Sequence, residues 1–164
     1  MPFSHPMLGK RAPFIALPDA NGNLYELPVG QKAIALYVFP RAGSPVCTKE
    51  ACAFNEARDL NPVFSYLNKY DFEIIGISGD PISRQHKFVQ NHNLNHVVLS
   101  DTSGEARRAY GVTKVLGFIP GRETFFIGRD GIIKGVCTKQ LNHKAHLALI
   151  ESCLRVETEV MENM

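Results

Sequence analysis

Short hydrophobic runs alternate along the chain with segments whose apolar residues recur at helical spacing. Two of the runs are almost continuously apolar, which predicts strands buried on both faces of a sheet. Two others flank Asn21-Gly22, a signal for a tight hairpin near the N-terminus. The last two are joined through Asp130-Gly131, a second hairpin signal. The predicted strands are 14–17, 23–27, 33–39, 72–78, 97–99, 123–127 and 132–136.

Helical spacing fills the intervals between these strands. A helix is expected from about Pro45, and Asn61-Pro62 predicts a kink or a new start before Phe64 and Leu67 continue the apolar spacing. A strand-helix-strand-helix-strand half, a hairpin and a closing helix predict an α/β fold, with helices on both faces of a mixed sheet. The other predicted helices are 81–91, 104–110 and 142–157.

Composition narrows the class of protein without naming a function. With 164 residues, 45% of them hydrophobic and 21% charged, the chain suits one globular domain. A net charge of +2 is too small to imply a nucleic-acid or acidic-membrane partner by itself, and we expect no nucleic-acid partner. Residues 1–6 lack the features of a secretory signal, and the longest apolar run, 33–39, is far below the ~20 residues that span a bilayer. We expect a cytoplasmic protein with no membrane partner.

The candidate chemistry lies in the cysteines. The chain has 4, too few for a disulfide-stapled secreted domain, and no CxxC pair suggests a zinc site or a thioredoxin-like redox motif. Cys47 follows a buried strand at the start of a predicted helix, with Ser44 as a good N-cap and Pro45 as a good first residue. Unpaired N–H groups and the helix dipole would stabilise a thiolate there, and Arg41 and Lys49 would add positive charge. On these grounds alone, a nucleophile and a small buried core residue both remain open.

The spacing between Cys47 and Cys52 determines whether they can form a disulfide within a helix. In an ideal helix, residues five apart have Cα atoms ~8.7 Å apart, whereas a disulfide needs about 4.4–6.8 Å. The two cysteines therefore cannot join while the helix is intact. If they do join, the first turns of that helix must unwind.

Segment 40–52 closely resembles the active-site signature of the peroxiredoxins: a proline, three residues, threonine or serine, two residues and a cysteine. Pro40, Ser44 and Cys47 occupy these positions, and a second cysteine five residues on resembles the peroxiredoxin Q, or bacterioferritin comigratory protein, subgroup. Ser44 replaces the commoner threonine and Val46 the usual glycine. Arg122 stands where the family has its active-site arginine. Four further segments match in order: 75–80, 99–101, 110–112 and 120–125.

The resemblance implies a single thioredoxin-like domain over residues 1–164 and a thiol peroxidase. Cys47 would be oxidised by hydrogen peroxide or an organic hydroperoxide to a sulfenic acid, Cys52 would resolve it as an intramolecular disulfide, and a thioredoxin-type dithiol would reduce that disulfide. No metal or cofactor is implied, and a monomer is expected because both cysteines lie in one helix. The implied catalytic and substrate-binding residues are Pro40, Ser44, Val46, Cys47, Cys52 and Arg122.

Two other functions use parts of the same pattern, and several other residues are candidates for chemistry. A redox-sensing module could use the same cysteine pair to signal to a partner, and a general thiol–disulfide oxidoreductase is disfavoured by the missing CxxC. Cys137 and Cys153 are predicted to be core or inert thiols. The remaining candidates for metal ligands are two histidine pairs. Either pair could supply two ligands, but no third ligand is evident from the spacing, so these histidines are predicted to be solvated surface residues. These pairs are His92 with His96, and His143 with His146.

Overall fold

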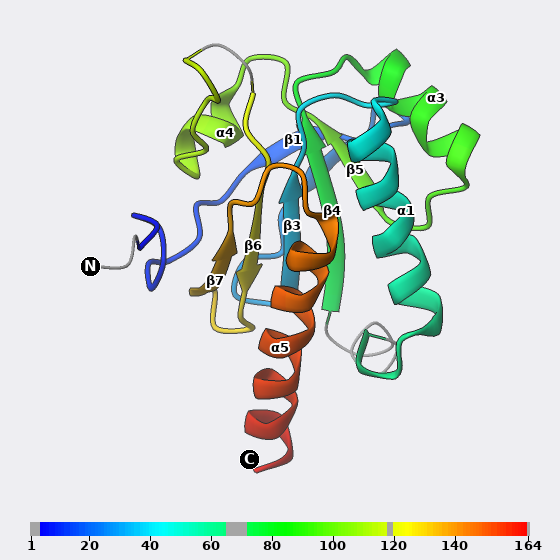
Figure 1. Cartoon of the computed structure of the whole chain (residues 1–164). Helices are drawn as coiled ribbons and strands as arrows, with labels where there is room; N and C mark the ends of the chain where they lie inside the picture. The colour runs from blue at the N-terminus through cyan, green and yellow to red at the C-terminus, as the bar shows by residue number, and fades with distance from the viewer. Residues whose placement is uncertain (1–3, 65–71, 118–119, 164) are drawn as a thin grey trace.

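A five-stranded mixed sheet forms the centre of the molecule (Figure 1). The computed structural model describes residues 4–64, 72–117 and 120–163. The strand order is β5-β4-β3-β6-β7; β3, β4 and β5 are parallel, whereas β6 and β7 are antiparallel to their neighbours. The strands of this sheet are β3 (Ala33–Val38), β4 (Phe72–Ser78), β5 (Val97–Ser100), β6 (Glu123–Ile127) and β7 (Ile133–Cys137).

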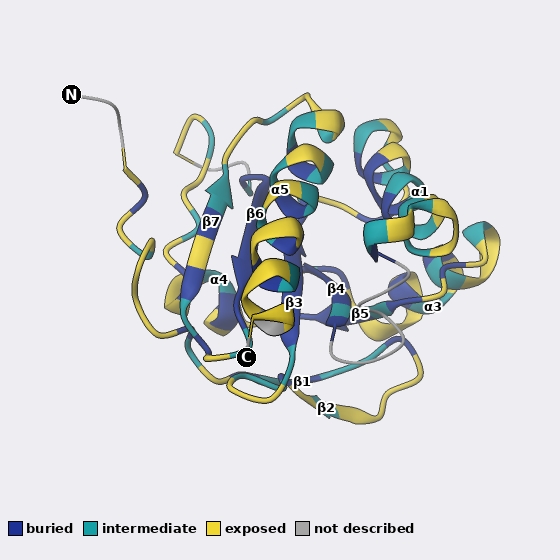
Figure 2. Cartoon of the chain, turned by 90° about the horizontal axis from the view of Figure 1, so that it is seen from below, coloured by how far each residue is buried: buried dark blue, intermediate teal, exposed yellow. Residues whose placement is uncertain are grey.

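Helices cover both faces of the sheet, as the sequence predicts. One core lies beneath α1, α3 and α5, and the other lies beneath α4 and the N-terminal segment. Figure 2 shows α1 and α5 on one side of the strands and the N-terminal hairpin on the other. In the described residues, no helix is long and apolar enough to cross a membrane. The helix bounds are α1 (Pro45–Leu60), α3 (Ile82–His92), α4 (Glu105–Ala109) and α5 (His143–Glu162).

The predicted N-terminal hairpin is present as β1 (Ala16–Pro18) and β2 (Leu24–Glu26). Its turn contains Gly22 at φ +83°, a left-handed conformation that glycine adopts without steric cost. The Asp19 carboxylate accepts backbone hydrogen bonds from Asn21 and Asn23 at 2.9 and 3.0 Å. These bonds close the turn locally, which is why the short Asn-Gly signal was sufficient to predict it.

Helix α1 ends where the sequence predicts a break. Asn61 is its C-cap and has an extended backbone (φ −81°, ψ 120°), as a residue before proline favours. The Asn61 side chain then accepts a hydrogen bond from the backbone N–H of Val63 at 3.0 Å. Phe64 is buried in the core, as its spacing predicts; Leu67 lies outside the described residues.

Helices α3 and α5 bury only some of the positions along their inner faces. In α3 the buried residues are Gln85 and Phe88, whereas Ile82 is 38% exposed. Gln85 lies in the interior with its amide nitrogen donating to the Ser78 hydroxyl and the Leu99 carbonyl, whereas its side-chain oxygen has no hydrogen-bond partner among the described residues. In α5, Leu147 is only partly buried.

The strand order brings distant parts of the chain to one edge of the sheet. Strand β3 ends there and leads into α1, and antiparallel β6 begins there, with Glu123 paired to Val38. Strand β7 is antiparallel to β6 and ends at the same edge, beside the start of α5. The residues just before β6, just after β7, and in the first turns of α1 and α5 must therefore lie close together.

Candidate active site

Cys47 lies in the first turn of α1 at this edge. The N-cap residue Ser44 has an extended backbone (φ −70°, ψ 152°), and Pro45 occupies the first turn, as predicted. The Cys47 side chain is a free thiol and is 1% exposed. The sulfur is therefore almost entirely shielded from solvent in this structure. Polar groups form one side of its surroundings.

Arg122 donates a hydrogen bond to the Cys47 sulfur. Its Nη2 lies 3.0 Å from Cys47 Sγ, and its Nη1 lies 2.8 Å from Glu50 Oε1. The guanidinium is 3% exposed, so the cation and both of its partners are removed from water. The sequence placed Arg122 near Cys47 through the family resemblance, and the structure confirms this proximity. A guanidinium held this close can donate to the sulfur and stabilise negative charge that develops on it or on an atom bound to it.

Gln140 holds Arg122 in place. The Arg122 Nε donates to the Gln140 carbonyl at 2.8 Å, and the Arg122 backbone N–H donates to the Gln140 side-chain oxygen at 2.8 Å. The Gln140 amide in turn donates to the carbonyls of Arg122 and Thr138, at 3.2 and 2.8 Å. Three nitrogens of the guanidinium thus have different acceptors, which leaves it little freedom to rotate away from the sulfur.

Glu50 is a site residue that the sequence analysis missed. It follows Cys47 by three residues, so the two side chains share a face of α1, and it is fully buried. Burial raises the pKa of Glu50 from 4.5 to about 7, although the Arg122 charge and hydrogen bond pull in the opposite direction. Its Oε2 has no hydrogen-bond partner among the described residues. The i, i+3 spacing was the available signal, but a glutamate in a helix is usually solvated.

Two of the histidines predicted to be solvated are buried instead. His146 is fully buried, with Nδ1 2.6 Å from Thr124 Oγ1, Nε2 2.6 Å from the Lys139 carbonyl, and Nδ1 3.6 Å from Glu50 Oε2. His96 is 7% exposed and contacts the Tyr37 hydroxyl at 2.5 Å, and burial lowers its pKa to about 3. Each histidine has local hydrogen-bond partners that a sequence pattern does not display, and these partners allow it to be buried.

The loop before α1 is fixed by hydrogen bonds that differ from the predicted ones. The Ser44 hydroxyl makes no helix-capping bond within the described chain and donates instead to the Arg41 carbonyl at 3.0 Å. The backbone N–H of Ala42 donates to the buried Asp80 carboxylate at 2.7 Å, which ties the loop to the end of β4. Pro40, Ser44 and Val46 are half-buried, whereas Arg41 and Lys49, expected to add charge near the sulfur, are exposed.

The other cysteines differ in setting from Cys47. Cys52 is half-buried on α1, and burial raises its pKa. Burial also raises the pKa of Cys137 and of Cys153, whose sulfur packs near Gly135. All four cysteines are free thiols. A raised pKa keeps these three thiols neutral and does not by itself distinguish Cys52 from Cys137 and Cys153, so the inertness of the last two stays a prediction.

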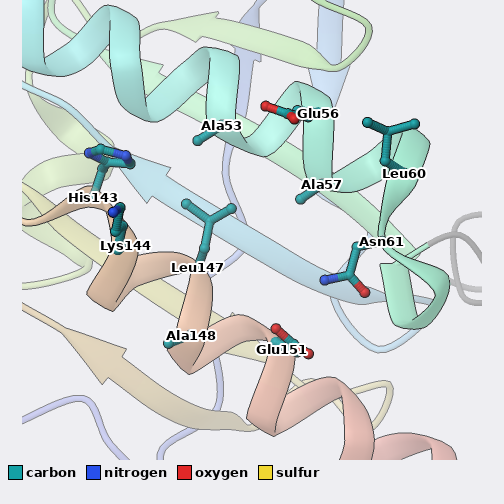
Figure 3. A pocket seen from close by; sticks show the side chains of 10 residues that line it. All are labelled: Ala53, Glu56, Ala57, Leu60, Asn61, His143, Lys144, Leu147, Ala148 and Glu151. Atoms are coloured by element: carbon teal, nitrogen blue, oxygen red, sulfur yellow. The ribbon is translucent and has the colours of Figure 1, made fainter.

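A groove of about 530 Å³ lies between α1 and α5, and Cys47 is not part of its lining (Figure 3). Its floor is formed by small and apolar side chains, including Ala53, Ala57 and Leu147, and charged side chains such as Glu56 and Glu151 stand around it. None of Cys47, Glu50 or Arg122 lines it. The groove is therefore separate from the cluster around the sulfur.

Comparisons with known proteins agree with this geometry. The pattern of the AhpC/TSA family matches residues 8–136. Peroxiredoxin Q of Suaeda salsa, described as chloroplastic, is 32% identical over 85% of this chain and 63% of its own length. Peroxiredoxin Q of Sedum lineare, also described as chloroplastic, is 30% identical over 85% of this chain and 73% of its own. The crystal structure of peroxidoxin BcpB from Mycobacterium tuberculosis superposes with a TM-score of 0.79 at 29% identity, over 92% of this chain and 97% of that one.

A thioredoxin-like sheet with a cysteine at a helix start and an arginine on its sulfur defines the peroxiredoxin class. This chain belongs to the AhpC/TSA family, within its peroxiredoxin Q group. The chain spans 63% and 62% of the length of the first two curated relatives that it matches.

Proposed function

We propose that this protein is a thiol peroxidase that reduces hydrogen peroxide and organic hydroperoxides, with Cys47 as the attacking thiolate. The observation that carries the proposal is the 3.0 Å hydrogen bond from Arg122 to the Cys47 sulfur, at the N-terminus of a helix. Both features stabilise negative charge on the sulfur and on the oxygen that leaves it.

The first step needs no cofactor. The thiolate electron pair attacks the distal oxygen of the hydroperoxide, an S–O bond forms, the O–O bond breaks, and the departing oxygen takes up a proton to give water or an alcohol. Arg122 would stabilise the charge that develops on that oxygen. Ser44 donates its own proton to Arg41, so its oxygen is left as an acceptor for the peroxide O–H. Pro40 and Val46 would form the apolar side of the peroxide site.

Cys52 would complete the cycle. Its thiol displaces hydroxide from the Cys47 sulfenic acid, which gives an intramolecular disulfide and water, and a thioredoxin-type dithiol then reduces the disulfide by exchange. In α1 as folded, residues five apart have Cα atoms too distant for that bond. Resolution therefore requires the first turns of α1 to unwind, which would also bring the disulfide to the surface for its reductant.

We further propose a single thioredoxin-like domain over residues 1–164 that works as a monomer in the cytoplasm. Both reactive cysteines belong to one helix, so no partner subunit is required for resolution. Four free thiols suit a reducing compartment.

The experiment follows hydroperoxide consumption and thiol oxidation in matched variants. Cys47→Ser should abolish peroxide consumption. Cys52→Ser should keep the fast first oxidation but lose turnover with thioredoxin, whereas Cys153→Ser should behave as the parent. If Cys52→Ser turns over normally, Cys52 is not the resolving residue; if the parent oxidises rapidly but does not turn over with any dithiol, a redox sensor replaces the peroxidase.

A further inference from the structure

Two buried acceptor atoms face each other behind the reactive sulfur. Glu50 Oε2 and His146 Nδ1 lie 3.6 Å apart, and both side chains are fully buried. The other oxygen of Glu50 accepts from Arg122, so Oε2 is the one left without a hydrogen bond among the described residues. A buried carboxylate oxygen without a donor is costly, and a second acceptor nearby makes it more so.

The hydrogen bonds of His146 define where its proton lies. Nε2 is 2.6 Å from the Lys139 carbonyl, which can only accept, so Nε2 carries a hydrogen. In the neutral imidazole, Nδ1 is then an acceptor for the Thr124 hydroxyl, 2.6 Å away. A hydroxyl can also accept, so Thr124 is compatible with a proton on Nδ1. The position therefore tolerates both protonation states of the ring.

The charge balance of the pocket couples this pair to the sulfur. Arg122 is the cation in contact with both Glu50 and Cys47, so an ionised Glu50 and a Cys47 thiolate compete for one guanidinium. A proton held between Glu50 and His146 cancels the carboxylate charge and leaves the guanidinium to the thiolate. The other titratable or charged groups that act on the pair and its neighbours are Tyr37, Cys52, Cys137, Lys139 and His143.

We propose that His146 is a positioning residue: with Glu50 it forms a buried pair, 3.6 Å apart, that holds one proton in all, and this proton commits Arg122 to the Cys47 thiolate. The proposal rests on the proposed function in taking Cys47 as the reacting sulfur. His146 touches neither the sulfur nor, by this argument, the peroxide. It acts through Glu50 and Arg122.

Burial supports the same arrangement of charge. It raises the pKa of Glu50 to about 7 and lowers the pKa of His146, with the Arg122 and His143 charges adding to the latter effect. The proton of the pair therefore resides mainly on Glu50 as a carboxylic acid, and Nδ1 remains the acceptor of the Thr124 hydroxyl. As pH rises through about 7, the pair loses this proton and the carboxylate begins to compete for Arg122.

The test titrates the Cys47 thiolate by its ultraviolet absorbance, in a Cys52→Ser/Cys137→Ser/Cys153→Ser parent that keeps Cys47 as its single thiol. His146→Asn removes a site that can hold the proton, and its amide can donate to an ionised Glu50. We expect the midpoint of thiolate formation to rise by about one pH unit. At a pH below both midpoints, the variant would then contain about tenfold less thiolate than the parent. His146→Gln, which can still donate to the Lys139 carbonyl, should shift the midpoint in the same direction.

Two controls separate this role from a structural one. His92→Asn removes a half-buried imidazole from the last turn of α3, which is not among the groups that act on the pair, and should leave the midpoint unchanged within a few tenths of a unit. Glu50→Gln makes the pair permanently neutral. It should lower the midpoint, and adding His146→Asn to it should produce no further shift.

The proposal is overturned if His146→Asn leaves the midpoint where it was, or if it shifts the midpoint equally with and without Glu50→Gln. It is likewise overturned if Glu50→Gln, which keeps His146, fails to lower the midpoint. The titration uses no peroxide, so its result is independent of whether the protein consumes peroxide. A failed peroxidase assay and a failed proton-sharing pair are thus distinguishable.

Discussion

Replacing Arg122 with lysine tests the central contact of the site while keeping a positive charge. The guanidinium meets three acceptors at once: the Cys47 sulfur at 3.0 Å, Glu50 at 2.8 Å and the Gln140 carbonyl at 2.8 Å. A lysine ammonium is a single point with three hydrogens and lacks the planar fork that reaches all three partners. The buried Glu50 would be the stronger competitor for it, and the sulfur would lose its donor.

The loss can be estimated from comparable sites. Removing one donor that stabilises charge in a transition state costs about 2.7–4 kcal/mol, or about 10²–10³ in rate. We therefore expect Arg122→Lys to lower the second-order rate constant of peroxide with reduced enzyme by about two to three orders of magnitude. Because lysine keeps a positive charge near the sulfur, we expect the smaller of these two losses, about two orders of magnitude.

The assay is stopped-flow oxidation of the reduced protein over a series of peroxide concentrations. The matched control is Arg155→Lys, since Arg155 also pairs with a glutamate at 2.8 Å but its side chain is 61% exposed on α5. We expect the control to react within about twofold of the parent, because an exposed pair contributes little. A rate for Arg122→Lys within about threefold of the control would refute the reasoning, since general positive charge would then suffice.

Two predictions concern stability and are read from urea unfolding. Gly76→Ala should lower the free energy of unfolding by about 1–3 kcal/mol, because its new Cβ would lie 2.7 Å from the buried Tyr37 ring. Glu50 has a raised pKa when folded, so its contribution to stability is full below about 4.5 and is lost as pH rises through about 7. Relative to Glu50→Gln, the parent should therefore lose about 3 kcal/mol between about pH 4.5 and about pH 8, and a flat difference would contradict the raised pKa.

Local signals in the sequence were sufficient to predict most helices and strands and to make Cys47 a candidate. Continuous apolar runs marked β3 and β4, Asn21-Gly22 marked the first hairpin, and Asn61-Pro62 marked the end of α1. Cys47 was a candidate because helix N-terminal chemistry depends on residues adjacent in sequence, but the family resemblance was needed to choose it over a buried core cysteine. The distance between Cys47 and Cys52 likewise follows from helix geometry alone.

Tertiary structure alone decided what surrounds the sulfur. Arg122, Gln140 and His146 reach Cys47 and Glu50 because antiparallel β6 and β7 begin and end at the edge where β3 ends, a fact of strand order that no local pattern encodes. The burial of Glu50 and His146, opposite to what their polarity suggests, depends on partners many residues away. Sequence determines the chemistry that a residue can perform, whereas the dielectric and the charges around it, which set its proton affinity, exist only once the chain has folded.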